Sequence, residues 1–201
     1  MVKRQPDKRK RSPIILLVCE GRNKTEKKFF SHFQQRDSKY KLIIKDSEAT
    51  DINGMARRAY NLYRENQMDP SLGDMAFCLI DLDCRKDKYE TYLKVKDRPQ
   101  FKNIEFVLSN PCFEVWLLYY FTEHPKVELC SQSVKEQLRK YVPEYTESLD
   151  IYEHCKLQDL FAVAINRSEK KNICYDESLS LVDRNPYTQV QDLIVVLKTN
   201  N

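Results

Sequence analysis

The stretch Ile14-Ile15-Leu16-Leu17-Val18-Cys19 is followed directly by Glu20-Gly21. Six consecutive apolar residues, several of them β-branched, indicate a strand that is buried on both faces. Strands of this kind occur in parallel sheets that are covered by helices, so this stretch favours an α/β fold. The acid and the glycine end the strand and begin a turn.

Two further stretches predict strands: the apolar run Met75–Ile80 before Asp81-Leu82-Asp83, and Ile104–Ser109, which includes Glu105, before Asn110-Pro111. A shorter strand is predicted at 42–44. Apolar residues at helical spacing predict helices between and after the strands: one capped by Thr25 that carries Phe29, Phe30 and Phe33, and others at 52–66, 89–96, 110–121, 134–141, 156–167 and 188–197. The alternation predicts an open, mainly parallel α/β sheet flanked by helices.

The length of 201 residues fits one domain. We expect it to span 13–201, with 123–201 as a C-terminal helical cap, behind a disordered basic tail at 1–12. The first eleven residues hold six basic residues and one acid, a net charge of +5, which leaves −1 on the remaining 28 basic and 29 acidic residues. Such a tail is either a solvated segment or an arm that contacts nucleic acid without reading its sequence.

Composition excludes several classes of protein. The three glycines, at 21, 54 and 73, are too far apart for a dinucleotide-binding turn or a phosphate-binding loop. The seven cysteines never form a CxxC pair, which argues against a zinc finger or a disulfide framework. The apolar run at the N-terminus is too short for a signal peptide or a membrane span. A cytoplasmic protein without a membrane partner is therefore expected.

Acidic and amide side chains follow the predicted strands. Glu20 follows the predicted strand at 14–19, Asp81 and Asp83 follow the one at 75–80, and Asn110 follows the one at 104–109. Ligands of open α/β sheets bind beyond the carboxyl ends of the strands, near a topological switch point. Converging carboxylates there would need a counter-charge, and a hard divalent cation suits oxygen ligands. Asp81 and Asp83 would project to one side if the chain is extended. Alternatively, each acid caps a helix or a turn.

Four motifs, taken in order, resemble the RloB-like group of Toprim-related bacterial proteins, which is linked to phage defence. They are Val18-Cys19-Glu20-Gly21 with Thr25-Glu26, then Asp81-Leu82-Asp83, then Asn110-Pro111-Cys112-Phe113-Glu114-Val115-Trp116-Leu117-Leu118, and last Asn185-Pro186-Tyr187-Thr188-Gln189-Val190. Five residues separate Glu20 from Glu26, more than in the group's usual Glu-Gly-x-x-Thr-Glu. The resemblance spans about 13–197.

The resemblance implies a Toprim-like fold whose acids hold Mg²⁺, or Mn²⁺ in its place, for phosphodiester cleavage. Glu20 would be a metal ligand and general acid/base, and Asp81 and Asp83 would be metal ligands. Glu26 would bind a second metal ion, and Glu114 would join the catalytic cluster. The implied partners are nucleic acid, with RNA such as tRNA preferred over DNA, an ATPase protein and further copies of the chain.

Four other side chains are candidates for contacting substrate: Arg22 and Lys24 beside Glu20, Asn110, and Arg184. His154 is either a surface residue or an acid/base group. The resulting hypothesis is a Mg²⁺-dependent nuclease effector of an anti-phage, abortive-infection-type system. Two alternatives stay open: a non-catalytic subunit docked on an ATPase, and a Toprim-type enzyme that acts on small nucleotides.

Overall fold

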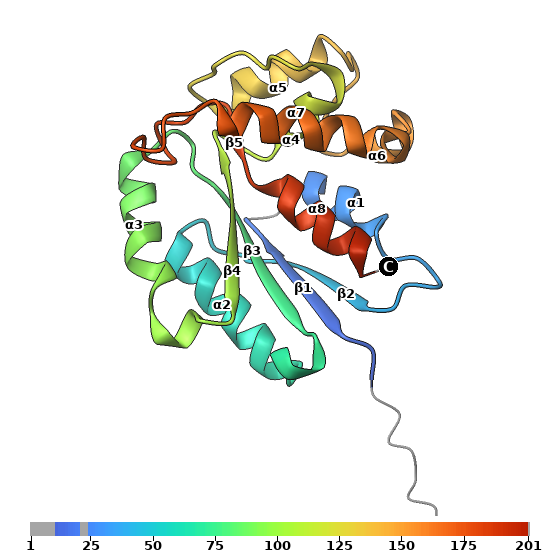
Figure 1. Ribbon diagram of the computed structural model, residues 1–201, viewed down its shortest axis with the longest axis vertical. Helices are drawn as coiled ribbons and strands as arrows, with labels where there is room; N and C mark the ends of the chain where they lie inside the picture. The colour runs from blue at the N-terminus through green and yellow to red at the C-terminus, as the bar shows by residue number, and fades with distance from the viewer. Residues whose placement is uncertain (1–10, 21–23, 201) are drawn as a thin grey trace, which may run out of the picture.

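The computed structural model describes residues 11–20 and 24–200. Within these residues, five strands form one sheet in the order β2-β1-β3-β4-β5 (Figure 1). The first four strands pair in parallel, whereas β5 is antiparallel to β4. The strands are β1 (Ile14–Cys19), β2 (Lys41–Asp46), β3 (Met75–Asp81), β4 (Ile104–Asn110) and β5 (Tyr187–Thr188). The predicted open, mainly parallel α/β sheet is therefore confirmed.

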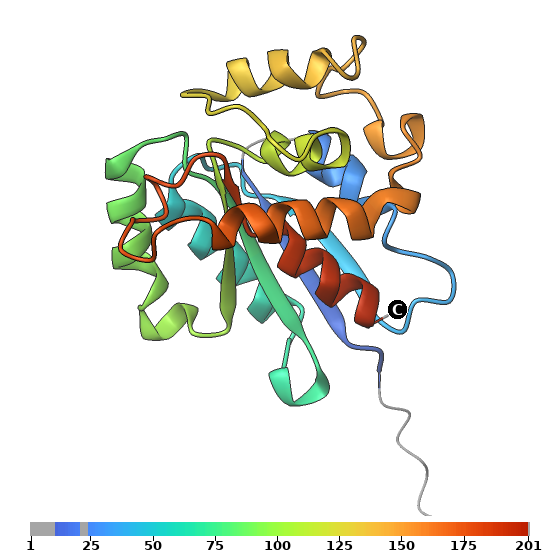
Figure 2. The same cartoon turned by 45° about the horizontal axis from the view of Figure 1, so that its top comes forward.

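Helices cover both faces of this sheet and its upper edge. Helices α2 and α3 lie on one face, α1 and α8 lie on the other, and α4 to α7 lie beyond the carboxyl ends of the strands (Figures 1 and 2). Their bounds are α1 (Lys24–Ser31), α2 (Ile52–Glu65), α3 (Lys86–Lys96), α4 (Glu114–Phe121), α5 (Ser131–Arg139), α6 (Ile151–His154), α7 (Phe161–Ile173) and α8 (Val190–Thr199). Short 3₁₀ turns lie at Pro70–Leu72, Pro99–Phe101 and Leu157–Leu160. Among the described helices, none combines the length and apolar character needed to cross a bilayer.

Strand β1 runs through the middle of the core. Its six residues are all buried, and they alternate between two hydrophobic clusters, one on each face of the sheet. Ile15 and Leu17 pack with the aromatic residues of α1 and α4, whereas Leu16 and Val18 pack with α2. Fully burying one such side chain contributes about 1.5–3 kcal/mol. This burial fixes the end of β1, and therefore the position of Glu20.

The predicted helix starts at Asn110 and Thr25 were wrong. The helix predicted from Asn110 begins at Glu114, because the preceding segment still lies beside the chain that follows β3: the N–H groups of Leu82 and Asp83 donate to the carbonyl oxygens of Ser109 and Pro111. The predicted cap Thr25 lies inside α1, which begins at Lys24, and its buried hydroxyl lies 3.4 Å from the hydroxyl of Tyr145, in the segment between α5 and α6.

The C-terminal part departs from the expected cap boundary at 123. Only the segment up to α7 lies above the sheet, because β5 pairs with β4 and α8 packs on the face that also holds α1. The predicted 156–167 helix is a 3₁₀ turn followed by α7, and the predicted 134–141 helix is α5. The predicted tail, 1–12, lies outside the described residues except for Arg11 and Ser12. The guanidinium of Arg11 pairs with the buried carboxylate of Asp74 at the start of β3.

Candidate functional site

The topological switch point of the sheet lies between β1 and β3. The chain leaves β1 toward β2 on one side, and β3 lies on the other side. Glu20 follows β1 directly, and Asp81 is the last residue of β3. Glu20 Oε2 accepts a hydrogen bond of 3.3 Å from the backbone N–H of Asp81. The two predicted residues therefore meet where open α/β sheets bind their ligands.

Asp83 lies in a turn after β3 and not in an extended strand. The prediction that Asp81 and Asp83 are alternate residues of an extended chain was therefore wrong. Asp83 and Cys84 have φ angles of +53° and +56°. Residues other than glycine rarely adopt this left-handed conformation, which costs about 1 kcal/mol or more for each. The N–H of Asp83 donates to the Pro111 carbonyl, and that of Cys84 donates to Asn110 Oδ1, both over 2.9 Å. The turn directs the chain into α3.

Helix α3 brings Lys88, which the sequence reasoning missed, between two of the acids. Its Nζ donates to both carboxylate oxygens of Glu20 and to Asp83 Oδ2, each over 2.9 Å. The Lys88 side chain is 8% exposed, that of Glu20 16% and that of Asp83 37%. Burial lowers the pKa of Lys88, but the Glu20 and Asp83 charges outweigh it, and the pKa is raised. The ammonium is thus charged at neutral pH.

Asp81 is at the centre of a larger acidic cluster. Burial raises the pKa of its carboxyl well above the usual range, and the nearby charges of Glu26, Glu114, Glu20 and Asp83 raise it further. Glu26 in α1 and Glu114 at the start of α4 are themselves buried. The pKa of Glu20 is also raised, mainly by burial, although Lys88 opposes the shift. We name these five carboxylates, Glu20, Glu26, Asp81, Asp83 and Glu114, the acidic cluster.

The cap helices close over the acidic cluster. Tyr145 donates a hydrogen bond of 2.9 Å to Glu114 Oε1, and its hydroxyl is 3.4 Å from Thr25 Oγ1. Lys135 of α5 places its Nζ 3.7 Å from the same Glu114 oxygen. Ser131, at the start of α5, donates to Asp83 Oδ1 over 3.0 Å. The segment 131–150 therefore contacts two acids of the acidic cluster, Glu114 and Asp83.

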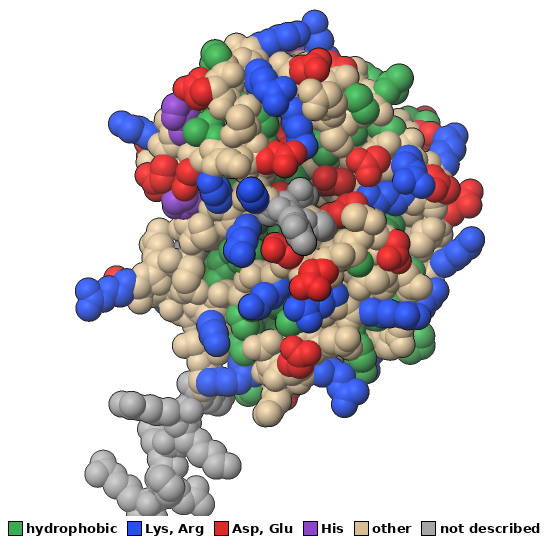
Figure 3. Space-filling model, turned by 180° about the vertical axis from the view of Figure 1, so that it is seen from behind, with side chains coloured by type: hydrophobic (Ala, Val, Ile, Leu, Met, Phe, Trp, Pro, Cys, Tyr) green, Lys and Arg blue, Asp and Glu red, His purple; other side chains and the backbone are tan. Residues whose placement is uncertain are grey.

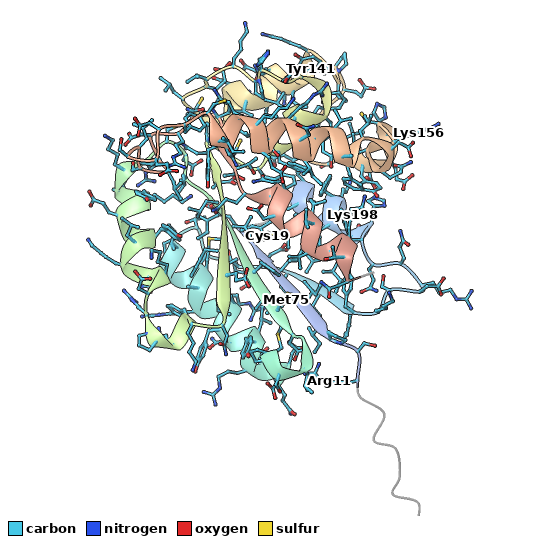
Figure 4. All side chains as sticks on the ribbon, in the orientation of Figure 1. Arg11, Cys19, Met75, Tyr141, Lys156 and Lys198 are labelled. Atoms are coloured by element: carbon cyan, nitrogen blue, oxygen red, sulfur yellow. The ribbon has the colours of Figure 1, made fainter. Side chains whose placement is uncertain are left out.

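Replacing Tyr145 by phenylalanine should destabilise the protein by about 1.5–3 kcal/mol, because a buried carboxylate would lose a hydrogen bond. The matched control is Tyr141→Phe, since Tyr141 is 46% exposed on the outside of the cap (Figure 4). Urea unfolding of both variants tests this. Equal stability of the two variants would show that the Tyr145 hydroxyl does not hold the cap to Glu114.

The other predicted contact residues lie elsewhere or serve the backbone. Asn110 is fully buried, and its amide donates to the carbonyl oxygens of Val182 and Arg184 over 2.8 and 2.9 Å. Arg184 donates to carbonyl oxygens of its own loop. Lys24 is exposed at the start of α1, and Arg22 lies outside the described residues. His154 pairs with Glu144 over 2.7 Å at the surface.

The donor set of the acidic cluster fits a hard divalent cation. All five side chains are carboxylates, the ligands that Mg²⁺ and Mn²⁺ prefer, and burial together with the neighbouring acids raises the pKa of Asp81 well above its usual range. Among the described residues, however, no group of three or more His, Cys, Asp or Glu side chains is arranged so that it could hold a metal ion. The Lys88 ammonium lies between Glu20 and Asp83 instead.

Acidic side chains gather near the middle of one face of the molecule, with lysine and arginine side chains around them (Figure 3). This mixed surface gives an anionic ligand positive charges to approach.

Comparison with known proteins gives one family. The model of the RloB-like protein family matches residues 15–197, nearly the whole chain. Neither the search of curated proteins nor that of solved structures gave a significant match. The match includes all four motifs discussed above and every residue of the acidic cluster. The chain therefore belongs to the RloB-like protein family.

Proposed function

We propose that this protein is a Mg²⁺-dependent phosphodiesterase that cleaves RNA. The observation that carries the proposal is the position of Asp81, a buried carboxyl at the switch point of the sheet whose pKa is raised by burial and by the charges of four other carboxylates. A purely structural cluster of this kind would destabilise the fold, because like charges repel in a poorly solvated site. Groups with strongly perturbed pKa values in such a location are typical of functional sites.

The residues divide into roles by their surroundings. Glu20, Asp81 and Asp83 would hold the cation, with Glu26 as a candidate ligand for a second one. When bound, Mg²⁺ would neutralise charge on the phosphate and polarise it for attack. Glu20 has a raised pKa, so its carboxylate is the group placed to accept the proton of the attacking nucleophile. Glu114 is held by Tyr145 and adds negative charge behind Asp81.

The family supports the biological setting of the proposal. The likeness to RloB-like proteins supports a role in bacterial anti-phage defence, together with an ATPase partner. We prefer RNA, such as tRNA, as the substrate. A non-catalytic subunit of an ATPase complex and an enzyme for small nucleotides are the competing functions, and the assay below separates all three.

The test is a cleavage assay with Mg²⁺ or with EDTA on tRNA, double-stranded DNA and free nucleotides. Wild-type protein should cleave RNA with Mg²⁺ alone. Glu20→Gln should reduce the rate by about 100-fold, because it removes a proton acceptor. Glu105→Gln is the matched control, since Glu105 is exposed at the start of β4, away from the cluster.

Three results would contradict the proposal. Cleavage that persists in EDTA would reject the metal assignment. Turnover of free nucleotides without effect on polynucleotides would favour the small-molecule enzyme. Absence of any turnover, with the ATPase partner present, would favour the non-catalytic subunit.

A further inference from the structure

We infer that Lys88 is an internal counter-ion that occupies the place of a divalent cation, so that metal binding requires the displacement of its ammonium group. The inference rests on the proposed metal site and deepens it, because it names the group that controls occupancy. It starts from the position of one buried cation between two of the carboxylates that the proposal assigns to the metal.

The contacts of Lys88 account for all of its hydrogen-bonding capacity. An ammonium has three N–H donors, and Nζ has three carboxylate oxygens at 2.9 Å: both oxygens of Glu20 and Oδ2 of Asp83. A cation that makes all three of these hydrogen bonds is held in a defined position between the two carboxylates. These are also the oxygens that would bind Mg²⁺, at about 2.0–2.1 Å. The ammonium and a metal ion cannot both occupy the space between them.

Displacement is physically accessible. Lys88 lies in the first turn of α3 on a flexible four-carbon stem, so its head can move without a shift of the helix. Asp83 is 37% exposed, which leaves the pair open to solvent on one side. Among the described residues, the ion pairs of Lys88 run to Glu20 and Asp83 and not to Asp81. A divalent cation would also neutralise negative charge at Asp81, whereas the single ammonium of Lys88 does not.

The inference has two measurable consequences. Without a metal ion, Lys88 stabilises the fold by separating the charges of Glu20 and Asp83. With a metal ion, the same side chain competes for the site and weakens the affinity. Removal of the ammonium should therefore lower the stability of the metal-free protein and, in the same variant, tighten the binding of Mn²⁺. A merely structural lysine would produce only the first effect.

The experiment is a Mn²⁺ titration of metal-free protein. Binding is measured by calorimetry and by the electron paramagnetic resonance signal of free Mn²⁺. Lys88→Met keeps the length of the stem without the charge, and Lys88→Gln is a second variant that keeps polarity if the methionine variant does not fold. Lys86→Met is the matched control, because Lys86 is on the same helix and its side chain is 75% exposed. We expect the Kd of Lys88→Met for Mn²⁺ to be at least about 10-fold lower than that of wild type, with Lys86→Met unchanged. Its melting temperature should be lower in EDTA and should recover with saturating Mn²⁺.

The outcomes separate the inference from the proposed function. Equal or weaker Mn²⁺ binding by both Lys88 variants, with binding by wild type, would overturn the role of Lys88 and leave the metal site standing. Absence of Mn²⁺ binding in wild type and in the Lys88 variants at millimolar metal would overturn the metal site and the inference together. Tighter binding by Lys88→Met or Lys88→Gln supports the inference, whether or not the variant cleaves RNA.

Discussion

Asp81→Asn should abolish Mg²⁺-dependent RNA cleavage, with a loss of about 1,000-fold, and at the same time it should stabilise the metal-free protein. The two effects have one cause. Burial and the charges of four other carboxylates raise the pKa of Asp81 well above the usual range, so the ionised form of Asp81 opposes folding when no cation is present. Asparagine keeps the shape and removes the charge. It therefore relieves the repulsion and also removes the central ligand of the proposed metal site.

The stability effect is measured by thermal unfolding in EDTA. A gain of about 1 kcal/mol would raise the melting temperature by about 2–4 °C in a chain of this length. Saturating Mn²⁺ should stabilise wild type and not Asp81→Asn. Asp37→Asn is the matched control, because Asp37 is exposed in the loop after α1, and it should change neither activity nor melting temperature. A lower melting temperature together with full activity would mean that Asp81 is a structural residue.

Much of the sheet could be predicted because its strands are long apolar runs. Strands β1, β3 and β4 were predicted at nearly their observed bounds, since five or six residues of each are buried and such stretches have few alternatives. Strand β5 was missed, because its two residues carry no periodicity and pair only through Ser109 and Asn110 of β4. That short pairing also explains why the chain from 187 onward returns to the sheet and does not stay in the cap.

Part of the candidate site followed from the same reasoning. Glu20 and Asp81 were expected together because parallel strands end at one edge, and the structure places them there. Lys88 was missed because its position depends on two left-handed residues, Asp83 and Cys84, and neither is a glycine that would have marked the turn. Tyr145 was missed because it comes from an irregular segment between α5 and α6, about thirty residues from Glu114. The one sequence signal for Lys88 was its position in the first turn of the helix that follows Asp81 and Asp83.

The second large effect concerns the opposite end of the sheet, where Asp74→Asn should cost about 2–3 kcal/mol of unfolding free energy, because buried N–H groups would lose their acceptor while the charge of the partly exposed Arg11 stays solvated. The Asp74 side chain is fully buried at the start of β3. Its carboxylate pairs with Arg11 and accepts hydrogen bonds of 2.7 Å from the N–H groups of Ile14 and Asp69. It thereby ties the start of β1 to the start of β3, near Arg11 and Met75 in Figure 4. An asparagine would keep one acceptor oxygen but would place its NH2 group against the N–H donors on the other side, and Arg11 would lose its charged partner.

The pH dependence of this effect has a definite sign. Burial raises the pKa of Asp74, but the hydrogen bonds from Arg11 and from the Asp69 and Ile14 N–H groups outweigh it, and the pKa is lowered. A carboxyl whose pKa is lower in the folded state stabilises the protein above its unfolded pKa of about 4. That contribution is lost as the pH falls through the folded pKa. The free energies of unfolding of wild type and Asp74→Asn, measured with urea, should therefore differ most near pH 7 and converge in acid. The control is Asp97→Asn, at a surface pair whose carboxylate is 74% exposed, and its free energy of unfolding should match that of wild type at every pH. Parallel curves for wild type and Asp74→Asn down to acid would mean that the charge of Asp74 does not hold the two strands together.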